Sequence, residues 1–309
     1  MNNAPTTEDR IWAVISHLSS LALGMGIVLP IIGWVDQRRK SNYASFQCLQ
    51  ALGYQSLGYT VWVLFSAVAV IIFVIIMLPT LNAARGPNEV GIWMSIYIVF
   101  IFGLFGSYFL LPIIAAISCA LGEDFRYPIL GNRLVSYLGY QQTSSSEESN
   151  WLIEDHENRW VAAIGHFAVI IALWGMLAPM TAWILFGKRS DFLKFQSIQT
   201  LVYQASVTIL YFGSVFLFLL GFTIISLLAL MGWTGDVRVD SSMGIVGIIF
   251  LGGSLLVLFI VILFVPLLHI LGQWAGYRVL KGDNYRYPFV GRLVESWIVN
   301  KTPLAEDGD

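Results

Sequence analysis

The sequence predicts an all-α integral membrane protein made of two tandem four-helix units. Its composition gives the first indication, because 57% of the 309 residues are hydrophobic and only 12% are charged, against roughly a quarter charged in a soluble domain. The second indication is a set of apolar runs long enough for membrane-spanning helices, which need roughly 20 residues. These runs are 61–78, 92–121, 209–230 and 243–271.

An internal repeat gives the third indication. Residues of the first half recur in the second at a constant offset of 149, among them His17 as His166 and Trp34 as Trp183. A later block, 122–131, returns as 282–291 at an offset of 160. An ungapped register over such uncommon residues indicates a duplicated unit.

The first unit, 1–140, is expected to begin with a helical hairpin. Gly24, Gly26 and Pro30 interrupt an otherwise continuous apolar stretch, and such residues weaken or break a helix. Two short helices therefore compete with one long helix. The helices expected in this unit are about 8–23, 27–37, 46–78 and 91–121.

Charge distinguishes the two possibilities. A single crossing in that stretch would invert the second unit and divide the Lys and Arg residues almost evenly between the two sides. A hairpin leaves only Arg85 and Arg238 of the 17 on the outer side. Positive residues concentrate in cytoplasmic loops, so the hairpin is preferred, with both termini cytoplasmic and the units related by a parallel pseudo-two-fold axis.

The second unit, 156–300, repeats this plan after a polar, Ser-rich linker at 141–155. Short helices on the membrane surface are expected after the last long helix of each unit, because Pro, aromatic, Arg and aliphatic residues mix there. A tail follows at 301–309. The remaining expected helices are 157–173, 176–187, 195–231 and 243–277, with surface helices at 127–138 and 287–299.

Two glutamine-rich helix faces are candidates for a functional site. Their members are spaced for one side of a helix and recur in both units, so their amides either line a polar path or bond one helix to another. Interhelical bonding is the simpler interpretation. The residues are Gln47, Gln50, Tyr54, Gln55, Gln196, Gln199, Tyr203 and Gln204.

The equivalent histidines, His17 and His166, stand in apolar surroundings, where an ionisable residue points to function. They are candidates for binding a haem or chlorophyll-type pigment or for relaying a proton. The alternative is a neutral imidazole bonded to a carbonyl or an amide. No cofactor motif accompanies either one, so neither a cofactor nor a metal is expected.

Basic residues mark two loops expected on the cytoplasmic side. They suit an anionic lipid or an acidic partner, although ordinary topology signals explain them equally well. The residues are Arg38, Arg39, Lys40, Lys188, Arg189 and Lys194.

The segments Arg10–His17, Pro30–Trp34 and Phe46–Gln55 resemble the Tic-twenty-like family of small bacterial membrane proteins. That family is related to a channel-associated component of the chloroplast inner-envelope import machinery. The resemblance implies a four-helix membrane unit and an analogy with protein transport. It supplies no catalytic residues.

These observations predict a multi-pass protein of the bacterial cytoplasmic membrane that is not an enzyme. An accessory, structural or assembly subunit acting through other membrane proteins is the preferred function. Protein translocation or permeation is the first alternative, and a cofactor-binding subunit with histidine ligands is the second. Contact with the lipid bilayer is expected, and nucleic-acid binding is not.

Overall fold

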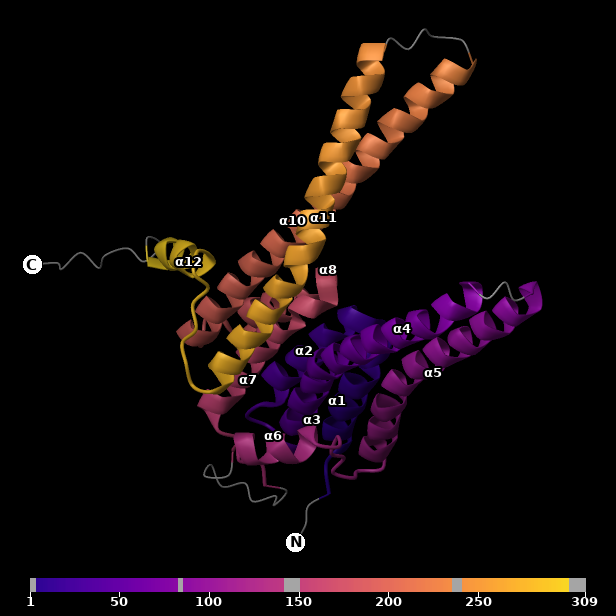
Figure 1. Ribbon diagram of the computed structural model, residues 1–309. Coiled ribbons are helices and arrows are strands. Elements are labelled where there is room, and N and C mark those ends of the chain that lie inside the picture. Colours follow the sequence, from indigo (N-terminus) through magenta and orange to yellow (C-terminus); the bar gives the residue numbers. More distant parts are fainter. Residues whose placement is uncertain (1–3, 83–85, 142–150, 235–240, 300–309) are drawn as a thin grey trace, which may run out of the picture.

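The computed structural model describes residues 4–82, 86–141, 151–234 and 241–299, and these fold into helices without a strand (Figure 1). The predicted all-α class is confirmed. The predicted tail at 301–309, most of the predicted linker, and the loops that contain Arg85 and Arg238 lie outside the described residues.

The first two helices form the predicted hairpin. Helix α1 (Thr7–Leu18) is followed by a 3₁₀ segment, η1 (Ser19–Ile27), and then by α2 (Val28–Gln37). Leu23 has φ of 52° inside η1 and interrupts the helical path there. The first helix therefore ends at Leu18 and not at residue 23 as predicted.

Contacts between the two helices confirm that they run antiparallel. Gln37, at the end of α2, donates from Nε2 to Oε1 of Glu8, at the start of α1, at 3.0 Å. A Cβ atom at Gly33 would lie only 3.0 Å from the Trp12 ring and 2.7 Å from Cys48 Sγ. The absence of a side chain at Gly33 thus permits the hairpin to close on the next helix.

The long helix that follows begins earlier than predicted. It comprises α3 (Asn42–Gly53), a single π-helical turn η2 (Tyr54–Gly58) and α4 (Tyr59–Asn82). Ser41 caps its N-terminus by accepting a hydrogen bond from the N–H of Ala44 at 3.2 Å, a preferred arrangement for serine. The predicted start at residue 46 overlooked this cap.

The second unit repeats the arrangement with different helix ends. Its hairpin consists of α7 (Glu154–Phe167), η4 (Ala168–Ile171), α8 (Ala172–Gly175) and α9 (Leu177–Phe186). The first helix was predicted at 157–173 and ends early because 3₁₀ turns replace it. It starts at Glu154, inside the predicted linker, directly after Ile153, whose N–H donates to the carbonyl of Leu138 at 3.0 Å.

Long antiparallel helices complete each unit. In the first unit α5 (Pro87–Ala120) returns beside α4, and in the second unit α10 (Asp191–Thr234) pairs with α11 (Ser241–Leu280). Their outward faces are apolar and exposed. Five helical segments in the described chain are long and apolar enough to cross a membrane, the first of which folds back as the hairpin. They are Thr7–Gln37, Asn42–Pro79, Pro87–Ala120, Asp191–Met231 and Ser242–Leu280.

The two surface helices are shorter than predicted. Helix α6 (Leu130–Leu138) begins after Ile129, whose φ of 65° is incompatible with a helix, and α12 begins at Val290. Ile129 and Phe289, the residues just before these helices, are 75% and 89% exposed. Exposed apolar side chains at these positions suit insertion into the membrane surface.

A shared core joins the two units. Buried side chains of α2, α3, α7 and α9 form one hydrophobic cluster, and the equivalent helices α2 and α9 pack against each other. Helix α3 also packs on α7. The equivalent pair, α10 of the second unit and α1 of the first, forms no contact of similar extent among the described residues, so the two-fold relation is approximate. Figure 1 shows the α4–α5 and α10–α11 hairpins diverging from this core, with their tips away from the end where the N-terminus lies.

Candidate functional site

Each unit contains a buried polar cluster centred on its histidine. In the first unit His17 of α1 is completely buried. Its Nδ1 lies 2.9 Å from the hydroxyl of Tyr127, and its Nε2 lies 3.0 Å from Oε1 of Gln47 on α3. Tyr127 follows α5 in the chain, so the cluster joins three segments that are far apart in the sequence.

The glutamine amides determine the direction of these hydrogen bonds. Gln50 donates from Nε2 to Gln47 Oε1 at 3.0 Å, and Gln47 donates from its own Nε2 to the carbonyl of Phe125 at 3.0 Å. Oε1 of Gln47 is therefore an acceptor, and Nε2 of His17 carries the proton that it accepts. Nδ1 then accepts from the hydroxyl of Tyr127, which describes a neutral imidazole.

The second unit repeats these bonds. Nδ1 of His166 lies 3.0 Å from the hydroxyl of Tyr287, and Nε2 lies 3.0 Å from Oε1 of Gln196. Gln199 donates to the same Oε1 at 2.6 Å. In both units the two ring nitrogens are engaged by protein groups, which favours the structural interpretation of the histidines over a ligand-binding one.

The outer residues of the predicted polar faces bond other helices. Tyr54 donates to the carbonyl of Tyr108 on α5 at 2.7 Å, and Gln55 donates to the carbonyl of Ser16 on α1 at 3.2 Å. The second unit has the same two kinds of bond, at 2.7 and 2.8 Å, from Tyr203 to Leu268 and from Gln204 to Gly165. The polar faces therefore tie both the short hairpin and the second long helix to the first long helix.

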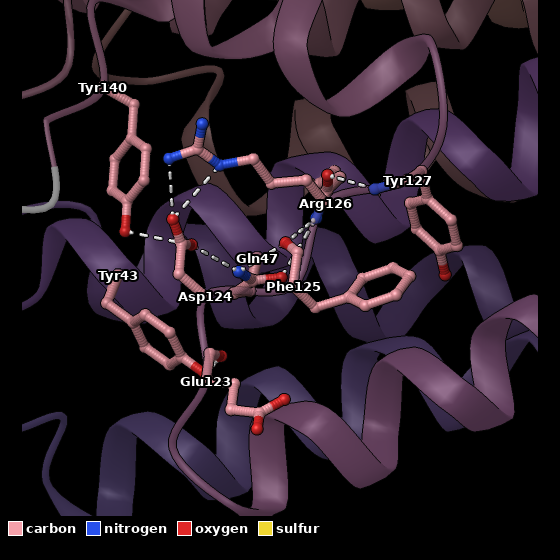
Figure 2. A network of polar contacts seen from close by, with 9 residues as sticks. Tyr43, Gln47, Glu123, Asp124, Phe125, Arg126, Tyr127 and Tyr140 are labelled. Carbon is pink, nitrogen blue, oxygen red and sulfur yellow. Dashed lines mark hydrogen bonds and ion pairs between the residues drawn. The ribbon is translucent and has the colours of Figure 1, made fainter.

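Asp124 extends the cluster of the first unit, as Figure 2 shows. Its Oδ1 accepts from Gln47 at 3.1 Å and from the hydroxyl of Tyr140 at 3.3 Å, and its Oδ2 lies 2.9 Å from the guanidinium of Arg126. The second unit has Asn284 at this position, which accepts from the equivalent glutamine at 2.7 Å. The two clusters thus differ by one charge.

A second polar site lies between the units. Glu157 of α7 is completely buried and accepts hydrogen bonds from the indole of Trp34 at 3.0 Å and from Arg38 at 3.2 Å. The guanidinium of Arg38 also lies 4.3 Å from the ring centre of Phe186 on α9 and 3.0 Å from the carboxylate of Glu154. These contacts connect α2 with both short helices of the other unit.

Burial changes the ionisation of this pair. It raises the pKa of Glu157 to about 7, even though Arg38 and the Trp34 N–H act in the opposite direction. Burial also lowers the pKa of the Arg38 guanidinium, which nevertheless stays charged because its ordinary pKa is so high. The charge between the units therefore responds to pH near neutrality.

The six basic loop residues divide into two kinds. Arg38 is buried at the unit interface, whereas Arg39 and Lys40 form exposed ion pairs of 2.8 Å with Glu154 and Asp36. Their position in a charged loop did not reveal this difference. The second loop holds Lys188 and Arg189, both exposed, whereas Lys194 was predicted in this loop but lies in α10 and is half-buried.

Both units match one known family. The magnetosome magnetite crystal formation protein family matches residues 8–135 and, a second time, residues 157–294. The chain belongs to this family. No curated protein and no solved structure gives a significant match.

The resemblance to the Tic-twenty-like family was wrong. The segments that suggested it, from Arg10 to Gln55, lie within the first match to the magnetosome family. They contribute to the hairpin and to the glutamine face, and the structure explains their spacing by helix packing. Such spacing is a requirement of the four-helix unit and does not identify a transport protein.

Sequence reasoning missed several residues of this magnetosome family member. Tyr127 and Tyr287 were expected in surface helices, yet both are buried beside the histidines. Their recurrence at the offset of 160 was a usable signal. Glu157 also went unnoticed, although Glu8 is its equivalent at the offset of 149.

Replacing Glu157 by Gln tests the titration at the unit interface. A free glutamate titrates near 4.5 and Glu157 near 7, so between these values the folded state holds more protons than the unfolded state. The contribution of Glu157 to stability therefore falls as pH rises from about 4.5 to 7, by at most about 1.4 kcal/mol per pH unit. The Glu157→Gln variant lacks this dependence.

Thermal unfolding of the purified protein in detergent at pH 5, 6, 7 and 8 measures the effect. The stability of the wild type relative to Glu157→Gln should decline between pH 5 and 7 and level off above pH 7. Glu123→Gln, at an exposed position, should show no such trend across that range. A constant difference between wild type and Glu157→Gln would contradict the buried titration.

Proposed function

We propose that this chain serves magnetite crystal formation as a non-enzymatic structural protein of the magnetosome membrane. The observation that carries the proposal is the family match, which covers each unit separately. The polar clusters support a structural role, because their histidines and glutamines bond protein groups on neighbouring helices. We place its partners among other membrane proteins that act in the same process.

The membrane arrangement is part of this proposal. Both termini and both basic loops lie on the cytoplasmic side, as the positive-inside rule favours. A membrane-impermeant thiol reagent should therefore label Arg39→Cys and Lys188→Cys from the same side, in a background in which both native cysteines are replaced by serine. Labelling of the two positions from opposite sides would refute the arrangement.

Deleting the gene in the magnetite-forming bacterium tests the proposed function. Magnetite crystals should change in number, size or shape, as measured by electron microscopy, and a copy of the full chain should restore them. Expression of that copy is then varied in steps. The crystal change should follow the amount of protein in the membrane in proportion, because a structural component acts by its own copy number.

A copy with an early stop codon, transcribed at the same level, is the matched control and should restore nothing. Unchanged crystals in the deletion strain would contradict the role in crystal formation. Full restoration by a few per cent of the normal protein level would contradict the structural role, since such an effect is typical of a catalyst.

A further inference from the structure

The second unit contains a cavity of about 310 Å³ between η4, α10 and α11. Valine and aromatic side chains form most of its wall, and Gln204, Thr208, Tyr211 and His269 add polar groups. This volume is at the lower end of the range for small-molecule sites, roughly 300–1,000 Å³. An apolar wall with a few polar groups is also typical of such sites.

The equivalent part of the first unit can be identified without ambiguity. Tyr54 donates to the carbonyl of Tyr108 in the first unit, and Tyr203 donates to that of Leu268 in the second. These bonds fix the offset as 149 on the first long helix and 160 on the second. The equivalents of the cavity residues follow from those offsets: Trp62 for Tyr211, Phe105 for Val265, Phe109 for His269 and Tyr59 for Thr208.

Aromatic rings pack together at that position in the first unit. The ring centres of Trp62 and Phe105 are 5.4 Å apart, and those of Phe105 and Phe109 are 5.0 Å apart. In the second unit Val265 stands in place of the Phe105 ring, whereas Tyr211 and His269 keep smaller rings at the other two positions. The cavity therefore lies where the first unit has the Phe105 ring, and the space that Val265 leaves can hold a ring supplied by a ligand.

Two side chains give the cavity hydrogen-bonding capacity. Gln204 is buried and bonds through Nε2, but its Oε1 has no donor among the described residues, and an unpaired buried acceptor is costly. The equivalent Oε1 of Gln55 also has no donor among the described residues. His269 replaces a phenylalanine within an apolar helix, where an ionisable residue is a pointer to function.

The position of the cavity indicates how a ligand reaches it. His269 lies 11 residues before Leu280, the end of α11, which corresponds to about 16 Å along the helix. Two side chains of the cavity wall, Tyr211 and Phe212, are 39% and 50% exposed, so the cavity opens on the apolar outer surface of the unit. A ligand that enters there travels through the bilayer and is therefore neutral and lipid-soluble.

We propose that this cavity binds a neutral, lipid-soluble molecule with a hydroxylated aromatic ring, of the phenol or hydroquinone class. Its ring occupies the space that Phe105 fills in the first unit, beside His269. Its hydroxyl donates to Oε1 of Gln204 or bonds to His269.

Binding of 2,3,5-trimethylphenol to the purified full chain tests the proposal, with its methyl ether as the comparison compound. The protein is heated to a series of temperatures, and the fraction that stays monodisperse is measured. The temperature at which this fraction falls to half is the unfolding midpoint, determined at each concentration of the phenol. The phenol should raise the midpoint of the wild type in a saturable manner, because a ligand that binds the folded state stabilises it. The methyl ether, which cannot donate a hydrogen bond, should raise it clearly less.

The first unit supplies the variant that fills the cavity. Val265→Phe with His269→Phe introduces the residues of the first unit and should abolish the response to the phenol. Leu267→Phe adds a ring at an exposed position and should keep the response. If the double variant does not fold, Thr208→Tyr, which introduces the equivalent of Tyr59, provides the same comparison.

Two results would overturn the proposal. An equal response of wild type and filled variant would mean that the phenol binds elsewhere. Equal responses to the phenol and its methyl ether would mean that the hydroxyl is not recognised and that the cavity accepts any apolar group, such as a lipid acyl chain.

Discussion

The need to pair polar groups that are buried in an apolar protein governs this structure. His17 and Gln47 are completely buried, and an unpaired polar group in such a setting costs about 1–3 kcal/mol or more. The cluster meets this need by joining the hairpin, the long helix and the segment after α5. Because partners lie on three segments, the bonds that satisfy the polar groups also position the helices.

Buried polar groups between the units must also be paired, and there an ion pair meets this need. Glu157 and Arg38 bring opposite charges into the shared core, and the indole of Trp34 satisfies the second carboxylate oxygen. Buried ion pairs contribute little net stability but disfavour arrangements that separate the partners. The pair therefore specifies how one unit sits on the other.

Duplication also allowed the units to diverge, as the exchange of Phe109 for His269 illustrates.

Much of the fold was predictable because its signals are local. The apolar runs and the glycines before Pro30 predicted the long helices and the hairpin, and the spacing of Gln47 and Gln50 predicted one polar face. Tyr127 was not predicted as the partner of His17, because 110 residues separate them and no periodicity relates them. The Ser41 cap had a local signal that the apolar pattern obscured. The cavity depends on the volumes of side chains from η4, α10 and α11, which a single stretch of sequence does not reveal.

Nitrogen-15 NMR of histidine-labelled protein in lipid bilayers tests most directly whether the clusters are closed structural units. We expect His17 and His166 to be neutral, protonated on Nε2, with Nδ1 as a hydrogen-bond acceptor, and to keep these signals from pH 6 to 8. Signals of a protonated Nδ1, of a charged imidazolium, or of a ring bound to a metal or pigment would contradict the account. The histidines would then be available for chemistry and would not hold the helices together.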